Sequence, residues 1–327
     1  MHSIARAVVS LLVAAAVAGV TAGPAAAQDE APWTVATADG DLGADRDNYS
    51  YTAEAGERID DGLVITNHGA GPLDLAVYGA DAFTTETGQL DLLAGGKPST
   101  GLGTWVHPAR DRVTVQPGQT TEVPFTVAVP AGAPSGDHLG GILTSLTQGD
   151  VERRVGLRIR VRVGGGLRPS LSVEDLGVAY SGTANPLGSG EATLTYTVRN
   201  TGNALLAARQ SATVSGPFGS RRVPAPPIPD SPQLLPGETW KVSVPVHAVT
   251  PAVHLTATVT LVPLLTDAAG STAPLPAADT TAHGWAIPWT LVGLLLALVA
   301  VLTVLRRRRR TKPSFAEHRP ERDDVTV

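Results

Sequence analysis

The chain contains no cysteine, and aromatic residues make up only 4% of its 327 residues. Without cysteine, disulfide bonds, thiolate nucleophiles and cysteine-bound metals are all excluded. The low aromatic content is unusual for a catalytic domain, although small β-sandwiches tolerate it. A fold without disulfides must be held together by core burial, which domains of roughly 100–150 residues can achieve.

Motifs that carry catalysis or bind metals are also missing. The eight histidines show no His-Glu-x-x-His pattern, and there is no Gly-x-Ser-x-Gly elbow. Gly164-Gly165-Gly166 lacks the lysine and the following helix of a phosphate-binding loop. The acidic run 39–48 favours a solvated loop over a calcium site, because EF-hand spacing is absent. The sequence therefore predicts a protein that is not an enzyme, with no cofactor and no metal site.

Charge is unevenly distributed along the chain. The formal net charge is −5, and residues 28–91 hold fourteen acidic residues against two arginines. An acidic exterior in this region argues against a nucleic-acid partner.

Both ends of the chain carry targeting signals. Residues 1–27 have the apolar stretch and the small-residue site of a signal peptide. The uncharged run 285–305 is about 31 Å long as a helix, which matches a hydrocarbon core of about 30 Å. Five arginines follow it and predict a cytoplasmic tail over 306–327. We therefore expect a single-pass type I protein of the cell membrane, with contact to the bilayer through 285–305.

The region between these signals alternates apolar and polar residues with a period of two, which predicts β-strands packed on one face. Examples are the runs 123–129, 155–163, 240–246 and 253–261. Turns such as Asn67-His68-Gly69 and Pro117-Gly118 recur in the same order as Asn200-Thr201-Gly202 and Pro236-Gly237. The sequence therefore predicts an all-β fold of two tandem Ig-like sandwiches, over 33–165 and 168–265, followed by a stalk over 266–284.

One predicted strand carries a ladder of arginines. Arg158, Arg160 and Arg162 project from the same face of the run 155–163 if it is a strand. Three guanidinium groups in a row suit phosphate or carboxylate ligands such as anionic wall polymers. The alternative is that they pair with acidic side chains of a neighbouring strand or of the second domain.

Several stretches resemble a known family of surface proteins. They are Tyr78–Gly88, Gly103–Val106, Val113–Gly118 and Val129–Ile142, in this order. The order is similar to that in the peptidoglycan-binding domain of WxL-interacting proteins of Gram-positive bacteria. The resemblance implies an export signal, two Ig-like domains, a membrane helix and a basic tail.

That resemblance implies a cell-surface protein that binds peptidoglycan, with WxL-type proteins as partners. Trp105 is then a further candidate ligand-binding residue, although a place in the core is the alternative. The leading expectation is a non-catalytic, membrane-anchored protein that binds peptidoglycan or another envelope component. The alternative is a structural or assembly adaptor that docks surface protein partners through the edges of its sandwiches.

Overall fold

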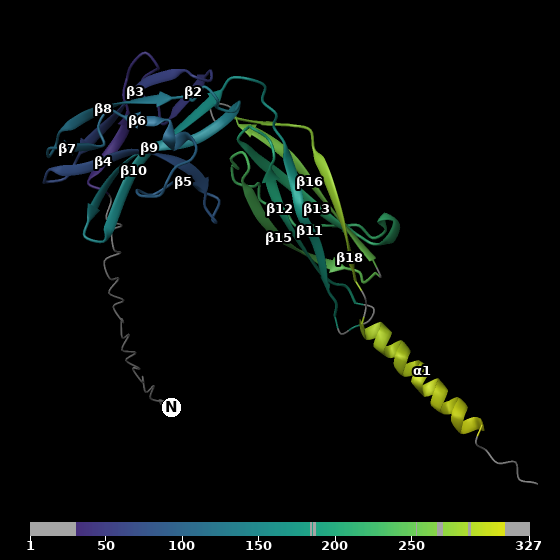
Figure 1. Ribbon diagram of the computed structural model, residues 1–327. Coiled ribbons are helices and arrows are strands. Elements are labelled where there is room, and N and C mark those ends of the chain that lie inside the picture. Colours follow the sequence, from purple (N-terminus) through teal and green to yellow (C-terminus); the bar gives the residue numbers. More distant parts are fainter. Residues whose placement is uncertain are drawn as a thin grey trace, which may run out of the picture.

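A computed structural model describes residues 31–183, 185, 188–252, 254–266, 271–286 and 289–310. The predicted signal peptide over 1–27 and residues 311–327 of the predicted tail lie outside the described residues. Two β-sandwiches follow each other along the chain and meet at an angle, and a helix lies beyond the far end of the second one (Figure 1).

The first sandwich packs two sheets around an apolar core. Its strands are β1 (Trp33–Thr37), β2 (Tyr49–Ala53), β3 (Arg58–Asn67), β4 (Leu73–Thr84), β5 (Leu90–Leu92), β6 (Val106–Pro108), β7 (Arg112–Val115), β8 (Thr120–Ala128), β9 (Gly136–Gln148) and β10 (Val151–Val163), with a 3-10 turn, η1, at Leu102–Thr104. One sheet has the order β1-β3-β8-β6, and the other has the order β2-β10-β9-β4-β5 with β7 also paired to β4. Val123, Phe125 and Val127 alternate along β8 and are buried between the sheets, as the period of two predicts.

The second sandwich has its own core and its own pair of sheets. Its strands are β11 (Leu171–Ser181), β12 (Gly190–Asn200), β13 (Leu206–Ser215), β14 (Val223–Pro224), β15 (Thr239–Val249), β16 (His254–Thr266), β17 (Thr272–Pro274) and β18 (Ala278–Trp285), with a 3-10 turn, η2, at Pro217–Gly219. The sheets are β11-β12-β15 and β14-β13-β16-β17, and β18 also pairs with β16. The prediction of an all-β chain built from sandwiches is confirmed.

The repeated turns form the same buried hydrogen-bond network in both sandwiches. In the first, the side-chain amide of Asn67 donates to the carbonyls of Gly71 and Val115, and its side-chain oxygen accepts from the N–H of Gly69. In the second, Asn200 donates to Ala204 and Leu234 and accepts from Gly202. Both asparagines are 0% exposed. Asn67 therefore ties its turn to a segment 48 residues further along the chain, and Asn200 ties its turn to one 34 residues further along, through buried hydrogen bonds.

The segment predicted as a stalk over 266–284 is different in the structure. Its described part contains β17 and β18, and β18 pairs antiparallel with β16 from His254↔Trp285 to Leu261↔Ala278. Gly284 lies so close to Val178 of β11 that a Cβ would overlap with it. The pattern was missed because the side chains of β18 are exposed or only half-buried, so no apolar alternation marks the strand.

The predicted membrane-spanning helix over 285–305 is wrong. Among the residues described, no helix has both the length and the apolar character of a membrane span. Trp285 belongs to β18, and the helix α1 (Trp289–Arg310) begins only at Trp289. The expected single-pass type I location and the expected contact with a bilayer depended on this helix and are withdrawn.

We predict that Asn200→Ala lowers the free energy of unfolding of the second sandwich by about 2–4 kcal/mol, because two buried carbonyls and one N–H lose their partner. Urea unfolding followed by circular dichroism measures the change. Thr201→Ala is the control, since the Thr201 hydroxyl makes only an exposed hydrogen bond to Ser170. Equal stability of the two variants would contradict a structural role of the buried asparagine.

Candidate functional site

Strand β10 carries the three arginines Arg158, Arg160 and Arg162, which are the candidate ligand-binding residues of the predicted strand 155–163. It pairs antiparallel with β9 along its whole length, from Val151↔Gln148 to Val163↔Gly136. Its odd-numbered residues from Ile159 to Val163 are buried in the core, so the even-numbered residues Arg158, Arg160 and Arg162 point to the other face. The shared orientation of the three arginines therefore agrees with the strand geometry.

Two of the three arginines bind a carboxylate of the neighbouring strand. Nη2 of Arg160 lies 2.9 Å from Oδ2 of Asp137, and Nε of Arg162 lies 2.8 Å from its Oδ1. The Asp137 side chain is 0% exposed. Burial by itself raises the pKa of Asp137, but hydrogen bonds from Arg162, the N–H of Leu205 and Arg160 outweigh it and hold the pKa below its usual value.

Asp137 also joins the two sandwiches. Its Oδ2 accepts a hydrogen bond of 2.9 Å from the N–H of Leu205, and its own N–H donates to the carbonyl of Asn203 at 2.8 Å. Nη2 of Arg160 donates to the carbonyl of Thr266 at 3.0 Å. Gly136 has a φ of +126° and lies against the carbonyl of Asn203, where a Cβ would overlap. The close approach of the two sandwiches therefore requires glycine at this position.

A second set of bonds joins the sandwiches at the end of β4. The carboxylate of Glu238 accepts from the N–H of Thr84 at 2.9 Å and from its hydroxyl at 2.6 Å. The same hydroxyl lies 3.1 Å from the carbonyl of Gln233. The two sandwiches are therefore held at two places by buried or half-buried polar groups.

Arg158 lies outside this interface and is exposed. Together with Glu152, Arg154 and residues 89–92 it lines a groove of about 660 Å³ between β10 and β5, which we name the β10–β5 groove. The guanidinium of Arg154 donates to the carbonyl of Leu92 across this groove at 2.9 Å. Leu90 and Arg158 also border a smaller cavity of about 190 Å³ towards the second sandwich.

Trp105 is 7% exposed and belongs to the apolar core of the first sandwich. Its ring lies 4.6 Å from the ring of His138, centroid to centroid. The structure therefore brings Arg160 and Arg162 together at Asp137, whereas Arg158 and Trp105 lie apart from that pair. A ligand-binding role of these four residues stays a prediction.

Sequence reasoning missed Asp137, Leu205 and Glu238 as the residues that join the sandwiches. Asp137 was visible within the stretch Gly136–Gly141, directly upstream of the arginine strand. Its role depends on the pairing Arg162↔Asp137, which only the register of β9 and β10 reveals. Among the described residues there is no group of three or more His, Cys, Asp or Glu side chains that could hold a metal ion.

Comparison with known proteins finds no matching family model and no matching curated protein. Among solved structures, a chaperone–tip adhesin complex of CFA/I fimbriae is 8% identical, covers 77% of this chain and 98% of its own, and has a TM-score of 0.39. The *Escherichia coli* chaperone DraB is 10% identical, with 76% and 96% covered and a TM-score of 0.34. The CsuC–CsuE chaperone–tip subunit complex of *Acinetobacter baumannii* is 10% identical, with 59% and 86% covered and a TM-score of 0.30.

These findings correct the family resemblance. No family model matches, and the three solved structures named above are chaperones or chaperone complexes of fimbriae or pili and not WxL-interacting proteins. The expected Gram-positive surface, peptidoglycan binding and WxL-type partners rested on that resemblance and are withdrawn. Because all three TM-scores are below 0.5, the likeness carries no information about the function of this chain.

We predict that Asp137→Asn lowers the free energy of unfolding by about 2–3 kcal/mol at pH 7. Fully buried pairs lose about 3–5 kcal/mol when one partner is removed, and the loss is smaller here because Arg160 and Arg162 are 14% and 29% exposed. The folded-state pKa of Asp137 is lowered, so the stabilisation is complete above the unfolded-state pKa of about 3.9. It is lost as the pH falls through the folded-state pKa.

Urea unfolding of both proteins between pH 3 and pH 7 tests this sign. The stability difference should be constant above about pH 5 and should shrink below about pH 4. Asp150→Asn is the control, because Asp150 is exposed in the turn between β9 and β10. A difference that grows on acidification would show that Asp137 does not act as a paired carboxylate.

Proposed function

We propose that this protein is a non-catalytic adaptor that docks a protein partner by strand addition along β10. The observation that carries this proposal is the unequal length of β10 and its neighbour. β10 has 13 residues, whereas β2 pairs with it only from Ile159 to Val163. No described strand pairs with the outer edge of residues 151–157, so this edge offers backbone groups to an incoming strand.

The direction of the backbone groups supports the proposal. In an antiparallel pair, successive residues alternate between bonds to the partner strand and bonds to the other side. The N–H of Arg158 points away from β9, because it donates to the side-chain oxygen of Asn48 at 3.3 Å. By this alternation the N–H groups of Glu152, Arg154 and Gly156 point to the same open side.

The side chains next to this edge indicate which pattern of apolar and polar residues an incoming strand needs. Val155 and Leu157 are half-buried and pack against the margin of the core, so an incoming strand covers them with apolar residues. On the other face Glu152, Arg154 and Arg158 border the β10–β5 groove. The partner strand therefore alternates, with apolar side chains on one face and polar side chains on the other.

We propose that the partner is a protein, because an incoming strand is a polypeptide segment. The CFA/I and Csu structures are described as chaperones in complex with tip subunits. A protein partner for this chain is proposed on the geometry of β10 and not on that likeness.

The experiment first identifies the partner and then tests the edge. A photo-crosslinking amino acid at position 152 or 154, in cells that produce the protein, should capture one dominant protein. The same amino acid at exposed position 111 is the control for non-specific capture.

The purified partner should then bind Arg154→Gln and should bind Arg154→Pro at least tenfold more weakly. Both variants lose the guanidinium, but only proline also removes the outward N–H, and proline is tolerated on an edge strand. Amide protection at positions 152 and 156 should rise on binding. Equal binding by the two variants, or capture no stronger than at position 111, would rule out strand addition at β10.

A further inference from the structure

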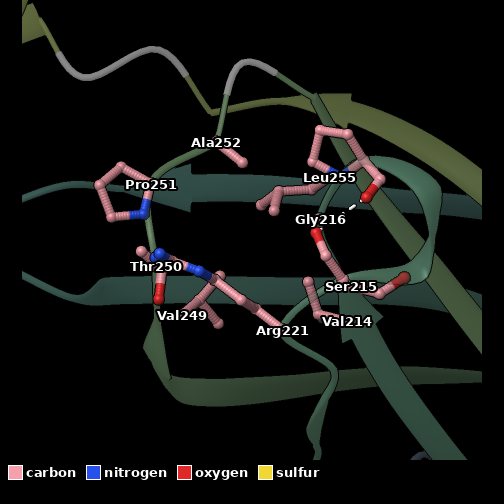
Figure 2. Close-up of a pocket in the computed structure, with 11 residues that line it drawn as sticks. Val214, Ser215, Gly216, Arg221, Val249, Thr250, Pro251, Ala252 and Leu255 are labelled. Carbon is pink, nitrogen blue, oxygen red and sulfur yellow. Dashed lines mark hydrogen bonds between the residues drawn. The ribbon is translucent and has the colours of Figure 1, made fainter.

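A cavity of about 240 Å³ lies at the end of the second sandwich, far along the chain from β10. One wall is formed by residues 215–217, 220 and 221, at the end of β13 and just after it, and the other by residues 249–252, at the end of β15 and just after it. Val214, Val249 and Leu255 are 0–2% exposed and form an apolar floor. Figure 2 shows this arrangement, with Arg221 extending across the cavity towards Thr250.

The polar groups of the cavity carry positive charge without a counter-charge. Ser220, Thr250 and Arg221 are among the lining residues, and no acidic side chain is. Within the part of the chain that the structure describes, Arg221 forms no ion pair. Arg222 follows it and is exposed as well. The Ser220 hydroxyl donates to the carbonyl of Pro217 at 2.8 Å, so an anionic group in the cavity would meet the guanidinium of Arg221 and the hydroxyl of Thr250, which are donors suited to a carboxylate.

The backbone around the cavity is held in an uncommon conformation. Phe218, Arg221 and Ala248 have φ values of 58°, 49° and 60°, in the left-handed region that glycine favours. Elsewhere among the described residues, the non-glycine residues with positive φ are Asp45 and Asp175, a residue type that tolerates this conformation. Such conformations are unfavourable for residues with a side chain, and they concentrate at ligand sites. Arg221 combines this conformation with a side chain that lines the cavity.

We propose that this cavity binds a small organic acid with a short apolar part. The apolar floor covers the hydrocarbon portion, and Arg221 pairs with the carboxylate while the hydroxyl of Thr250 donates to it. The site is independent of strand addition at β10, because the two share no residue. The carboxylate comes either from a free acid or from the C-terminus of a peptide with an apolar last residue.

The test is methyl NMR of the full chain, observed at Val214, Val249 and Leu255 during titration. Hexanoate is the probe for a free acid. A pentapeptide ending in leucine, with a free or an amidated C-terminus, is the probe for a peptide. Hexanol and acetate supply the apolar part alone and the charge alone.

We expect saturable shifts with hexanoate or with the free peptide, and at least tenfold weaker binding of hexanol and acetate. Arg221→Gln should weaken hexanoate binding at least tenfold and leave hexanol binding unchanged. Arg222→Gln is the matched control and should retain hexanoate binding, since Arg222 does not line the cavity. Stronger binding of the free peptide than of hexanoate, lost on amidation, would assign the site to a chain terminus.

Three results would overturn the proposal. One is that no carboxylate probe produces saturable shifts. Another is equal binding of hexanoate and hexanol by the wild-type protein, a result that does not depend on the folding of any variant. The third is equal hexanoate binding by Arg221→Gln and Arg222→Gln.

Discussion

The buried carboxylate of Asp137 is the interaction on which the arrangement of the molecule depends. It accepts from two arginines of β10 and from the backbone of Leu205 in the second sandwich. A carboxylate that is 0% exposed is tolerated only when its charge is compensated and its oxygens are hydrogen-bonded, and both conditions are met here. Because the same group serves both sandwiches, the direction of β10 and the position of the second sandwich are determined together.

The long strands β10 and β16 differ in how far their second edge is paired. β16 and β10 both have 13 residues, and each pairs along one side with a long neighbour, β13 and β9. The other side of β16 is covered by β17 and β18, whereas that of β10 is covered only over its last five residues by β2. An open strand edge is exposed to unspecific pairing unless charge protects it, and Glu152 and Arg154 lie on this part of β10. Unlike β16, β10 therefore keeps an unpaired stretch of edge, and this stretch is where strand addition is proposed.

Buried polar groups, and not only apolar packing, set the register of each sandwich. Asn67 and Asn200 make equivalent bonds between a turn and a segment distant in sequence, and the two sets of turns occur in the same order in the sequence. A core of valine, leucine and alanine without disulfides is tolerant of small shifts. An asparagine with three fixed hydrogen-bond partners is not, because a shifted register would leave buried carbonyls unpaired.

The sequence alone determined the β-class, the buried faces of strands such as β8 and β16, the turns, and the common face of Arg158, Arg160 and Arg162. These features depend on a period of two and on turn chemistry, which are local properties. The tertiary structure alone decided that Asp137 is the partner of two arginines, that β18 joins the sheet, and that the outer edge of β10 is left open. The physical reason is that pairing, register and burial of a charge depend on residues distant in sequence, such as Asp137 and Leu205, which no local pattern relates.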